Sequence, residues 1–216
     1  MTDHQFEHMR RAMVASQLRT TGVNDPRVLA AMGAVPRELF VPDQYASAAY
    51  ADMLLPIGHG RQLNTPMALG RMLTEAGLDG SERALVIGAG TCYAAAVTAR
   101  LVHSVVALEE VPELVAFART RLEGSGVELV EGPLHEGWTQ GAPYDFILID
   151  GAVEDIPQAI IDQLADGGEL AAGLLEGGVP RLSVGRAIGG AFGATSYSDA
   201  AAPELPGFRK PRGFSF

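Results

Sequence analysis

An apolar run that ends on two closely spaced glycines is the feature that most constrains the fold of this chain. Residues 84–87 (Ala-Leu-Val-Ile) have the composition of a buried strand, and Gly88-Ala89-Gly90 follows at once. From Tyr93 onward, small and apolar residues are typical of a helix. Strand, glycine turn and helix in this order open the nucleotide-binding crevice of doubly wound α/β domains. A tight structural turn is the alternative, because Cys92 replaces the third glycine of the dinucleotide motif.

The chain is strongly acidic, with 16 Lys and Arg against 26 Asp and Glu and a net charge of −10 over 216 residues. This balance argues against a general nucleic-acid-binding protein, which would carry a basic stripe. No apolar run reaches membrane-spanning length, and the first residues lack the pattern of a signal peptide. A single cysteine excludes an internal disulfide framework, and the five histidines have no metal-ligand spacing. We therefore expect a cytoplasmic protein without nucleic-acid or membrane partners.

Residues 1–78 are expected to form an N-terminal helical extension, with an acceptor-side loop, that packs on the core. Apolar residues at helical spacing predict a first helix over residues 2–21. Pro26 after Asp25 marks the start of a second helix, and Pro66 after Asn64-Thr65 marks the start of another. The segment between them at residues 52–66, with its glycines and His59, reads as an irregular loop.

Residues 79–216 are expected to form a core in which strands and helices alternate, which favours an open, mostly parallel sheet. The fold class is therefore α/β, Rossmann-like and doubly wound, with a C-terminal antiparallel hairpin. The Pro- and Gly-rich tail at residues 201–216 is expected to lie extended over the body. Predicted strands lie at 84–87, 103–108, 127–130, 144–150 and 169–174, helices at 93–101, 112–122 and 156–164, and the hairpin at 181–188 and 192–198.

Glu109 is the acidic residue that the glycine turn requires. It lies about twenty residues after Gly88 at the end of the next predicted strand, where a carboxylate receives the ribose hydroxyls of an adenosine cofactor. A carboxylate accepts two charge-assisted hydrogen bonds from a diol. S-adenosylmethionine has no phosphate and so relaxes the need for a third glycine, whereas a dinucleotide oxidoreductase would retain it. A surface Glu that ends a strand is the alternative interpretation.

The chain resembles the protein-L-isoaspartate O-methyltransferases, a class of S-adenosylmethionine-dependent methyltransferases. The resemblance extends from about residue 10 to 175. The segment before the glycine turn is its specific part, because generic methyltransferases lack it. The matching stretches are Gln17-Leu18-Arg19, Gly22-Val23, Asp25 to Leu29, Val35 to Pro42, Ala49 to Asp52, Leu55 to Gly60, Gly88 to Tyr93, Ala95-Ala96, Leu108-Glu109, Pro112 to Leu114, Glu136 to Trp138, and Ala142 to Asp145.

The resemblance implies methylation of the α-carboxylate of isoaspartyl residues in damaged proteins or peptides, by a monomer or weak dimer. An α-carboxyl group with a pKa of roughly 3.5 is ionised at neutral pH, so the reaction needs no general base. Alignment of the reactants then becomes the enzyme's main task. The resemblance implies that Gly88, Ala89, Gly90 and Thr91 form the cofactor turn.

Three positions depart from the family's pattern. Asn64, followed by Thr65, stands where the family usually has a serine near the reacting carboxylate, and both are candidate catalytic residues. Val86 replaces an acidic residue before the first glycine. Pro133-Leu134 replaces an Asp-Gly pair whose Asp accepts from the adenine amino group, which leaves the Leu134 amide as a candidate contact.

These departures keep two other hypotheses open. One is a non-catalytic binding module that retains the fold, and the other is a methyltransferase for a different small acceptor. His59 and Cys92 each have a functional and a structural interpretation, and the structural one is favoured for both. Asp150, at the end of the predicted central strand, is expected near the crevice.

Overall fold

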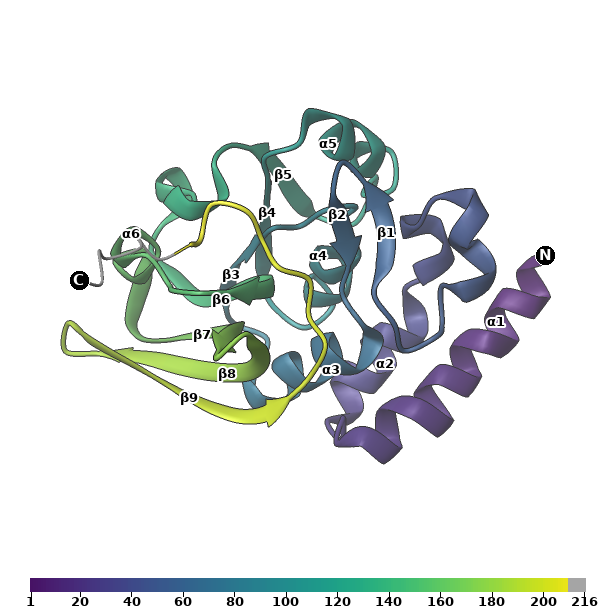
Figure 1. Ribbon diagram of the computed structural model, residues 1–216, viewed down its shortest axis with the longest axis horizontal. Coiled ribbons are helices and arrows are strands. Elements are labelled where there is room, and N and C mark those ends of the chain that lie inside the picture. Colours follow the sequence, from purple (N-terminus) through teal and green to yellow (C-terminus); the bar gives the residue numbers. More distant parts are fainter. Residues whose placement is uncertain (210–216) are drawn as a thin grey trace.

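A seven-stranded sheet forms the centre of the molecule (Figure 1). The computed structural model describes residues 1–209. The strand order is β5-β4-β3-β6-β7-β8-β9, in which β3 to β7 are mutually parallel and β8 and β9 are antiparallel additions. The strands are β3 (Arg83–Ile87), β4 (Ser104–Glu109), β5 (Val127–Glu131), β6 (Tyr144–Val153), β7 (Leu164–Glu176), β8 (Val179–Ile188) and β9 (Ala191–Asp199). The Rossmann-like class and the C-terminal hairpin are confirmed.

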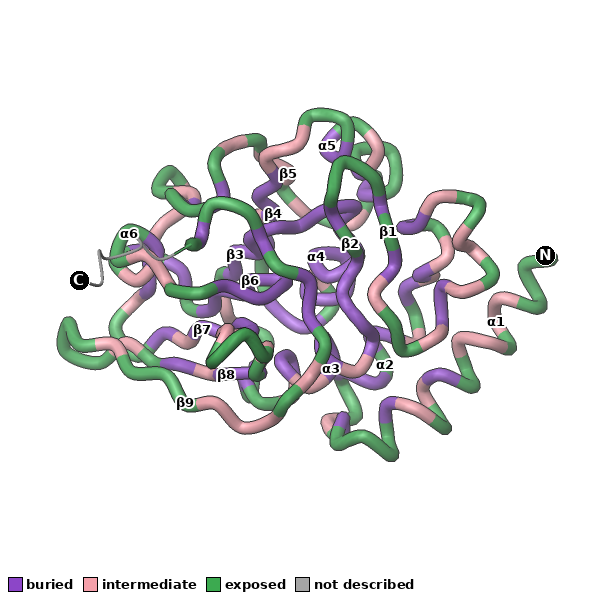
Figure 2. The backbone as a smooth tube through the Cα atoms, viewed as in Figure 1, coloured by how far each residue is buried: buried purple, intermediate pink, exposed green. Residues whose placement is uncertain are grey.

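Alternate residues of the central strands serve two separate hydrophobic cores. In β3, Ala84 and Val86 belong to one core and Leu85 and Ile87 to the other, as the two-residue period of a strand requires. Figure 2 shows this central region as almost continuously buried. The buried apolar runs of β3 and β6 are therefore the sequence signature of strands covered on both faces.

The first core lies under helices. These are α2 (Pro26–Ala34), α3 (Pro66–Glu75), α4 (Tyr93–Thr98) and α5 (Pro112–Arg119), together with the N-terminal segment. That segment continues as α1 (Asp3–Ala12), a π-helical stretch Met13–Leu18 and a 3₁₀ turn Arg19–Thr21. Short 3₁₀ turns follow at Arg37–Phe40 and Asp43–Ala48. Residues on both sides of position 78 share this core, and the division into two domains there stays a prediction.

The second core is covered by less regular structure. It contains residues of α6 (Gln158–Ile161), the 3₁₀ turn Leu134–Glu136 and the C-terminal segment, including Leu205 and Phe208. A further 3₁₀ turn spans Thr139–Gly141. No helix within residues 1–209 is long and apolar enough to cross a membrane.

Two sequence predictions about elements are wrong. The segment 52–66 is not an irregular loop, because β1 (Leu55–Gly58) and β2 (Arg61–Leu63) pair in an antiparallel hairpin. Its turn contains His59 and Gly60, both in the left-handed region with φ of 53° and 72°. The inward-facing positions Leu55, Ile57 and Leu63 are buried, so burial of alternate residues holds the hairpin in place.

The second error concerns the region after β6. The helix expected at 156–164 spans only Gln158–Ile161, and β7 begins at Leu164 rather than at 169. The helix ends early because the Gln163 carbonyl accepts a hydrogen bond from the Tyr144 amide (2.8 Å), so the chain has already joined the sheet. The Asp166-Gly167-Gly168 stretch is an irregularity within β7, with Gly167 at a φ of 84°.

Candidate functional site

The crevice of a doubly wound sheet lies where the strand order reverses. Here the chain passes from β3 to β4 on one side, and β6 pairs with β3 on the other. The carboxyl ends of β3 and β6 therefore border the crevice. The glycine turn follows β3, and Asp150, Gly151 and Ala152 form the end of β6.

The glycine turn is a tight reversal fixed by backbone hydrogen bonds. Gly88 and Gly90 have φ of 74° and 56°, which a residue with a Cβ adopts only at a steric cost. The Gly88 and Ala89 amides both donate to the Leu108 carbonyl at 3.1 Å. Cys92 follows at a φ of 70° as the N-cap of α4 and is fully buried. Burial raises the pKa of the Cys92 thiol, so this cysteine is a packing residue, in line with the favoured interpretation.

Glu109 lies directly against this turn and is fully buried. Its Oε2 accepts from the Gly90 amide at 2.7 Å. Its Oε1 accepts from the Glu110 and Val111 amides at 3.0 and 3.1 Å. The structure thus brings together the turn and the acidic residue that sequence spacing paired. The carboxylate is of the type that binds a ribose diol, and its present partners are the protein's own donors.

Arg61 is the fourth donor to Glu109, and sequence reasoning missed it. Its side chain extends from β2, and Nη1 donates to Glu109 Oε1 at 2.7 Å. Nη2 donates to the Gly88 carbonyl at 3.2 Å. The Arg61 side chain is only 5% exposed, so this ion pair is largely withdrawn from solvent. A guanidinium therefore occupies the position in front of Glu109 where a ribose was expected from the sequence.

A C-terminal strap, which we define as residues 201–209, fills more of the crevice. The Ala152 amide donates to the Pro203 carbonyl at 2.7 Å, and the Leu205 amide donates to the Ala152 carbonyl at 2.9 Å. The strap thereby pairs in parallel with the end of β6 at Ala152 and Glu204. The expectation that the tail lies extended over the body holds for these residues, while 210–216 lie outside the described part of the chain.

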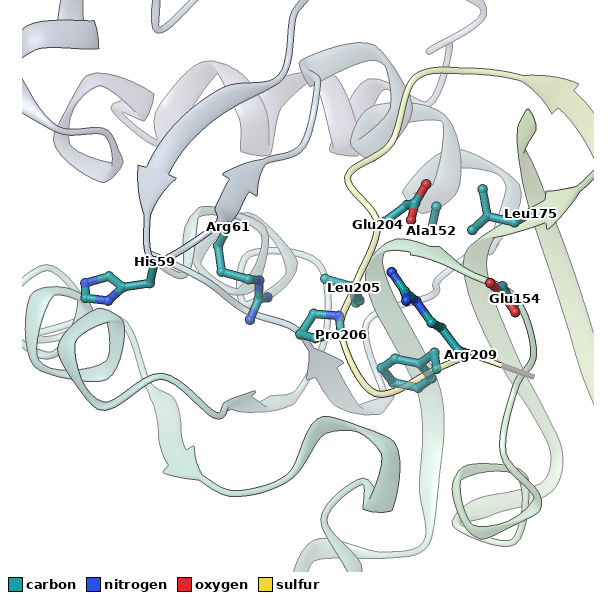
Figure 3. Close-up of a pocket in the computed structure, with 11 residues that line it drawn as sticks. His59, Arg61, Ala152, Glu154, Leu175, Glu204, Leu205, Pro206 and Arg209 are labelled. Carbon is teal, nitrogen blue, oxygen red and sulfur yellow. The ribbon is translucent and has the colours of Figure 1, made fainter. Parts of the chain in front are cut away.

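Leu205 occupies the space directly above the glycine turn. A Cβ added at Gly88 would lie 2.7 Å from Leu205 Cδ1 and 3.3 Å from Arg61 Nη2. A Cβ added at Gly151 would lie 2.7 Å from Leu205 Cγ. Figure 3 shows Leu205 and Pro206 on the strap beside the Arg61 side chain.

A pocket remains open beside the strap. It has a volume of about 310 Å³, and its walls include His59, Arg61, Glu154, Leu205 and Arg209 (Figure 3). The polar groups of the crevice suit an adenosine cofactor. The space against Gly88 and Glu109 does not fit one while Arg61 and Leu205 occupy it.

The two candidate catalytic residues are buried and hydrogen-bonded within the protein. Asn64 Nδ2 donates to Asp150 Oδ1 at 3.0 Å, and Asn64 Oδ1 accepts from the Thr65 amide at 2.8 Å. Thr65 Oγ1 accepts from the Ala68 amide at 3.1 Å as the N-cap of α3. The buried Arg37 guanidinium donates through Nη2 to the Asn64 carbonyl at 2.6 Å. The Asn64-Thr65 segment, the expected acceptor loop, is thereby fixed to the end of β6.

Asp150 is the titratable group between the acceptor loop and the crevice. Burial raises its pKa to about 6, while the hydrogen bond from Asn64 and the charges of Arg37 and Arg61 oppose the rise. Only 4% of the residue is exposed. Its position near the crevice is as expected, and its pairing with Asn64 has no counterpart in the sequence pattern.

Of the other candidate cofactor residues, Thr91 and Leu134 are packed inside the protein, whereas Pro133 is exposed. Thr91 Oγ1 donates to the Phe40 carbonyl at 2.6 Å. Leu134 is fully buried in the second core, which also contains Leu205 and Phe208. Next to it, Gly207 of the strap approaches His135, since an added Cβ would lie 3.4 Å from Nδ1. The strap therefore extends from the glycine turn to the segment Pro133-Leu134 where the adenine was expected.

Comparison with known proteins links this arrangement to one enzyme family. The model of the family described as protein-L-isoaspartate(D-aspartate) O-methyltransferase matches residues 9–179. A protein-L-isoaspartate O-methyltransferase from a Picosynechococcus species is 43% identical over 165 residues, which cover 75% of this chain and 74% of the relative. A protein-L-isoaspartate O-methyltransferase 2 from Marinobacter nauticus is 40% identical over 198 residues, which cover 88% and 90%.

Solved structures give the same result for the fold. A protein-L-isoaspartate O-methyltransferase superposes with a TM-score of 0.81 at 25% identity, covering 92% of this chain and 66% of that one. A proposed enzyme of the same kind from Plasmodium falciparum, in complex with S-adenosyl-L-homocysteine, superposes with a TM-score of 0.77 at 18% identity, covering 89% and 96%.

Proposed function

The chain belongs to the protein-L-isoaspartate O-methyltransferase family, and we propose that it transfers the methyl group of S-adenosylmethionine to the α-carboxylate of isoaspartyl residues in damaged proteins. One observation carries this proposal. The family match is continuous from residue 9 to 179 and so includes both the acceptor loop and the glycine turn with its acidic partner. The match therefore supports both acceptor binding on one side of the crevice and cofactor binding on the other.

On the cofactor side, we propose that Gly88, Ala89, Gly90 and Thr91 form the turn and that Glu109 takes the ribose. The Pro133-Leu134 segment would face the adenine. The buried Glu109 carboxylate beside the Gly90 amide supports this assignment. The cofactor supplies an electrophilic methyl group when bound. The present packing of Arg61 and Leu205 has to change before it enters.

On the acceptor side, we propose that Asn64 and Thr65 position the substrate. The α-carboxylate that receives the methyl group is already ionised at neutral pH, since its pKa is roughly 3.5. The residues around it therefore need to orient it and exclude water rather than remove a proton. Asn64 suits such a role because its amide group already holds a carboxylate, that of Asp150.

The experiment is methyl transfer from labelled S-adenosylmethionine to an isoaspartyl peptide, with the aspartyl peptide of the same sequence as the reference acceptor. We expect label on the isoaspartyl peptide alone. Glu109→Gln should abolish most of this activity, because an amide accepts weaker hydrogen bonds from a diol than a carboxylate does. Glu131→Gln is the matched control, because Glu131 pairs with Glu109 on the neighbouring strand but is exposed. Equal labelling of both peptides, or none, would contradict the proposal.

The proposal extends to the setting in which the protein works. A net charge of −10 favours a protein substrate over nucleic acid as the partner. We infer a cytoplasmic enzyme that acts as a monomer or weak dimer and has no membrane partner. Sedimentation at several protein concentrations measures the oligomeric state directly.

A further inference from the structure

The C-terminal strap lies in the crevice that the proposed function assigns to the cofactor. We propose that the strap and S-adenosylmethionine compete for this crevice, so that the strap holds the protein in a closed, inactive state until it is displaced. The inference rests on the proposed function, because it takes the cofactor to bind at Gly88–Gly90 and Glu109.

The backbone of the strap marks its place at the ligand-binding edge of the sheet. Pro203 and Leu205 exchange hydrogen bonds with Ala152, one residue beyond Gly151 on β6. Ligands of doubly wound sheets bind outside the carboxyl ends of the strands at this switch point. The strap therefore lies across the mouth of the crevice rather than along the outer edge of the sheet.

The side chains of the strap supply the apolar contacts inside the crevice. Leu205 is 6% exposed and Phe208 is 3% exposed, and both belong to the second core. Leu205 touches the space above Gly88 and Gly151. Close approach of backbone to a ligand is a reason for glycine at such positions, and here the strap makes that approach.

Arg61 makes the polar contacts that close the crevice beside Leu205. Its guanidinium neutralises Glu109 and caps the Gly88 carbonyl. A Cβ added at Gly88 would touch both Leu205 and Arg61, so the two side chains meet above one glycine. A ligand that reaches both Gly88 and Glu109 must displace both. Burial of the Glu109 charge is then compensated by Arg61 in the closed state and by hydroxyl donors in the open state.

The strap is held weakly enough to be displaced. Within the described residues, its backbone pairs with β6 through the two hydrogen bonds at Ala152. Pro203 and Pro206 have no amide hydrogen to donate, so the ladder cannot extend past them on that side. Gly207, at a φ of 85°, then turns the chain. Of its buried residues, Ala202, Pro203, Leu205 and Phe208, the last two carry the largest apolar side chains, so truncating either one should weaken docking.

The test measures binding of S-adenosylhomocysteine to the full-length protein by titration calorimetry. Leu205→Ala weakens docking of the strap and leaves the proposed cofactor contacts intact. The apparent affinity of a protein is reduced by the fraction of molecules in the binding-competent state. We therefore expect Leu205→Ala to bind at least about tenfold more tightly than the native chain. Phe208→Ala should act in the same direction.

Ile188→Ala is the matched control, since it removes a similar apolar side chain that is 64% exposed at the tip of the β8–β9 hairpin. It should bind as the native chain does. Hydrogen exchange of the Leu205 amide provides a second measurement, because this amide donates to Ala152 only in the closed state. We expect it to exchange faster when S-adenosylhomocysteine is bound to the native protein.

The outcomes separate the inference from the proposed function. If the native chain methylates isoaspartyl peptides and neither strap variant binds S-adenosylhomocysteine more tightly, the competition is overturned and the function stands. Continued protection of the Leu205 amide in the bound state overturns it equally. If no variant binds at millimolar concentration, the cofactor assignment fails, and the competition fails with it.

Discussion

Asp150 is a buried carboxyl group whose ionisation the fold opposes. Its folded pKa of about 6 lies above the ordinary value of 3.8, so the native state binds its proton more tightly than the unfolded state does. The stability that this proton contributes is fully present below pH 4 and is lost as the pH rises through 6. We expect Asp150→Asn to gain about 2–3 kcal/mol relative to the native chain between pH 4 and pH 7.

The measurement is urea unfolding of both proteins at pH 4 and pH 7. The exposed Asp43→Asn is the control, and its stability difference from the native chain should stay the same at the two pH values. A constant difference for Asp150→Asn would show that burial of Asp150 does not perturb its titration.

The Arg61–Glu109 ion pair is expected to be strongly coupled. Its side chains are 5% and 0% exposed, and removing one partner of a buried pair leaves a charge without compensation. Arg61→Met should therefore lower the free energy of unfolding by about 3 kcal/mol or more. Glu109→Gln on the Arg61→Met background should recover part of that loss, because the remaining group is then neutral. A double-mutant cycle by urea unfolding measures the coupling, and additive losses would contradict it.

The sequence pointed to Glu109 but not to its partner Arg61, and it pointed to Asn64 and Asp150 without predicting that they pair. Glu109 follows from its distance to Gly88 and its place at a strand end. Its partner Arg61 lies 48 positions earlier, and Asn64 and Asp150 are 86 positions apart. Nothing local links such residues, because their contact depends on how the β1–β2 hairpin docks on the sheet.

At the level of elements, Thr65 has a definite structural role as the N-cap of α3. Its hydroxyl accepts from the Ala68 amide, which otherwise has no helical partner. Thr65→Ala should lose about 1 kcal/mol more stability than Thr65→Ser, since both lose the methyl group and only serine keeps the cap. Chemical denaturation checks this difference. Equal losses would show that the hydroxyl does not stabilise the helix.

Helix starts were the best-predicted elements. Asp25 before Pro26 and Thr65 before Pro66 are local signals, and both helices begin where these signals lie. The β1–β2 hairpin was missed because its strands are only four and three residues long. Its turn also places His59, a residue with a Cβ, at positive φ, where sequence rules favour glycine or asparagine. The early start of β7 was not predicted because an Asp-Gly-Gly sequence normally ends a helix or strand, whereas here it lies within the strand.

For the whole molecule, Gly70 controls how the N-terminal region packs against α3. A Cβ there would lie 2.8 Å from Val23 Cγ2 and 3.1 Å from Met32 Sδ, both in the buried core. Gly70→Ala should therefore destabilise the protein by about 1–3 kcal/mol despite the better helix propensity of alanine.

Gly33 is the matched control in α2. Its added Cβ would meet only Val14 Cγ2 at an ordinary 3.6 Å. Gly33→Ala should be neutral or stabilise by up to about 1 kcal/mol. Thermal unfolding distinguishes the two variants, and an equal shift in both would show that close packing at Gly70 does not matter.

The overall architecture was predictable because the central strands β3 and β6 are largely apolar runs bounded by turn residues, at 84–87 and 144–150. The closure of the crevice by the strap was not predictable from the sequence. Leu205 and Phe208 lie in a Pro- and Gly-rich tail without periodicity, and only the assembled sheet creates the surface on which they pack.

The short connection between β9 and the strap has a quantitative consequence. β9 ends at Asp199, and the strap pairs with Ala152 from Pro203 onward. The strap acts as a ligand tethered by very few residues, so its effective concentration at the crevice is on the order of millimolar, whatever the concentration of the protein. Dilution therefore leaves the closed fraction unchanged. The fraction of molecules with an open crevice then depends on the concentration of free cofactor and not on that of the protein.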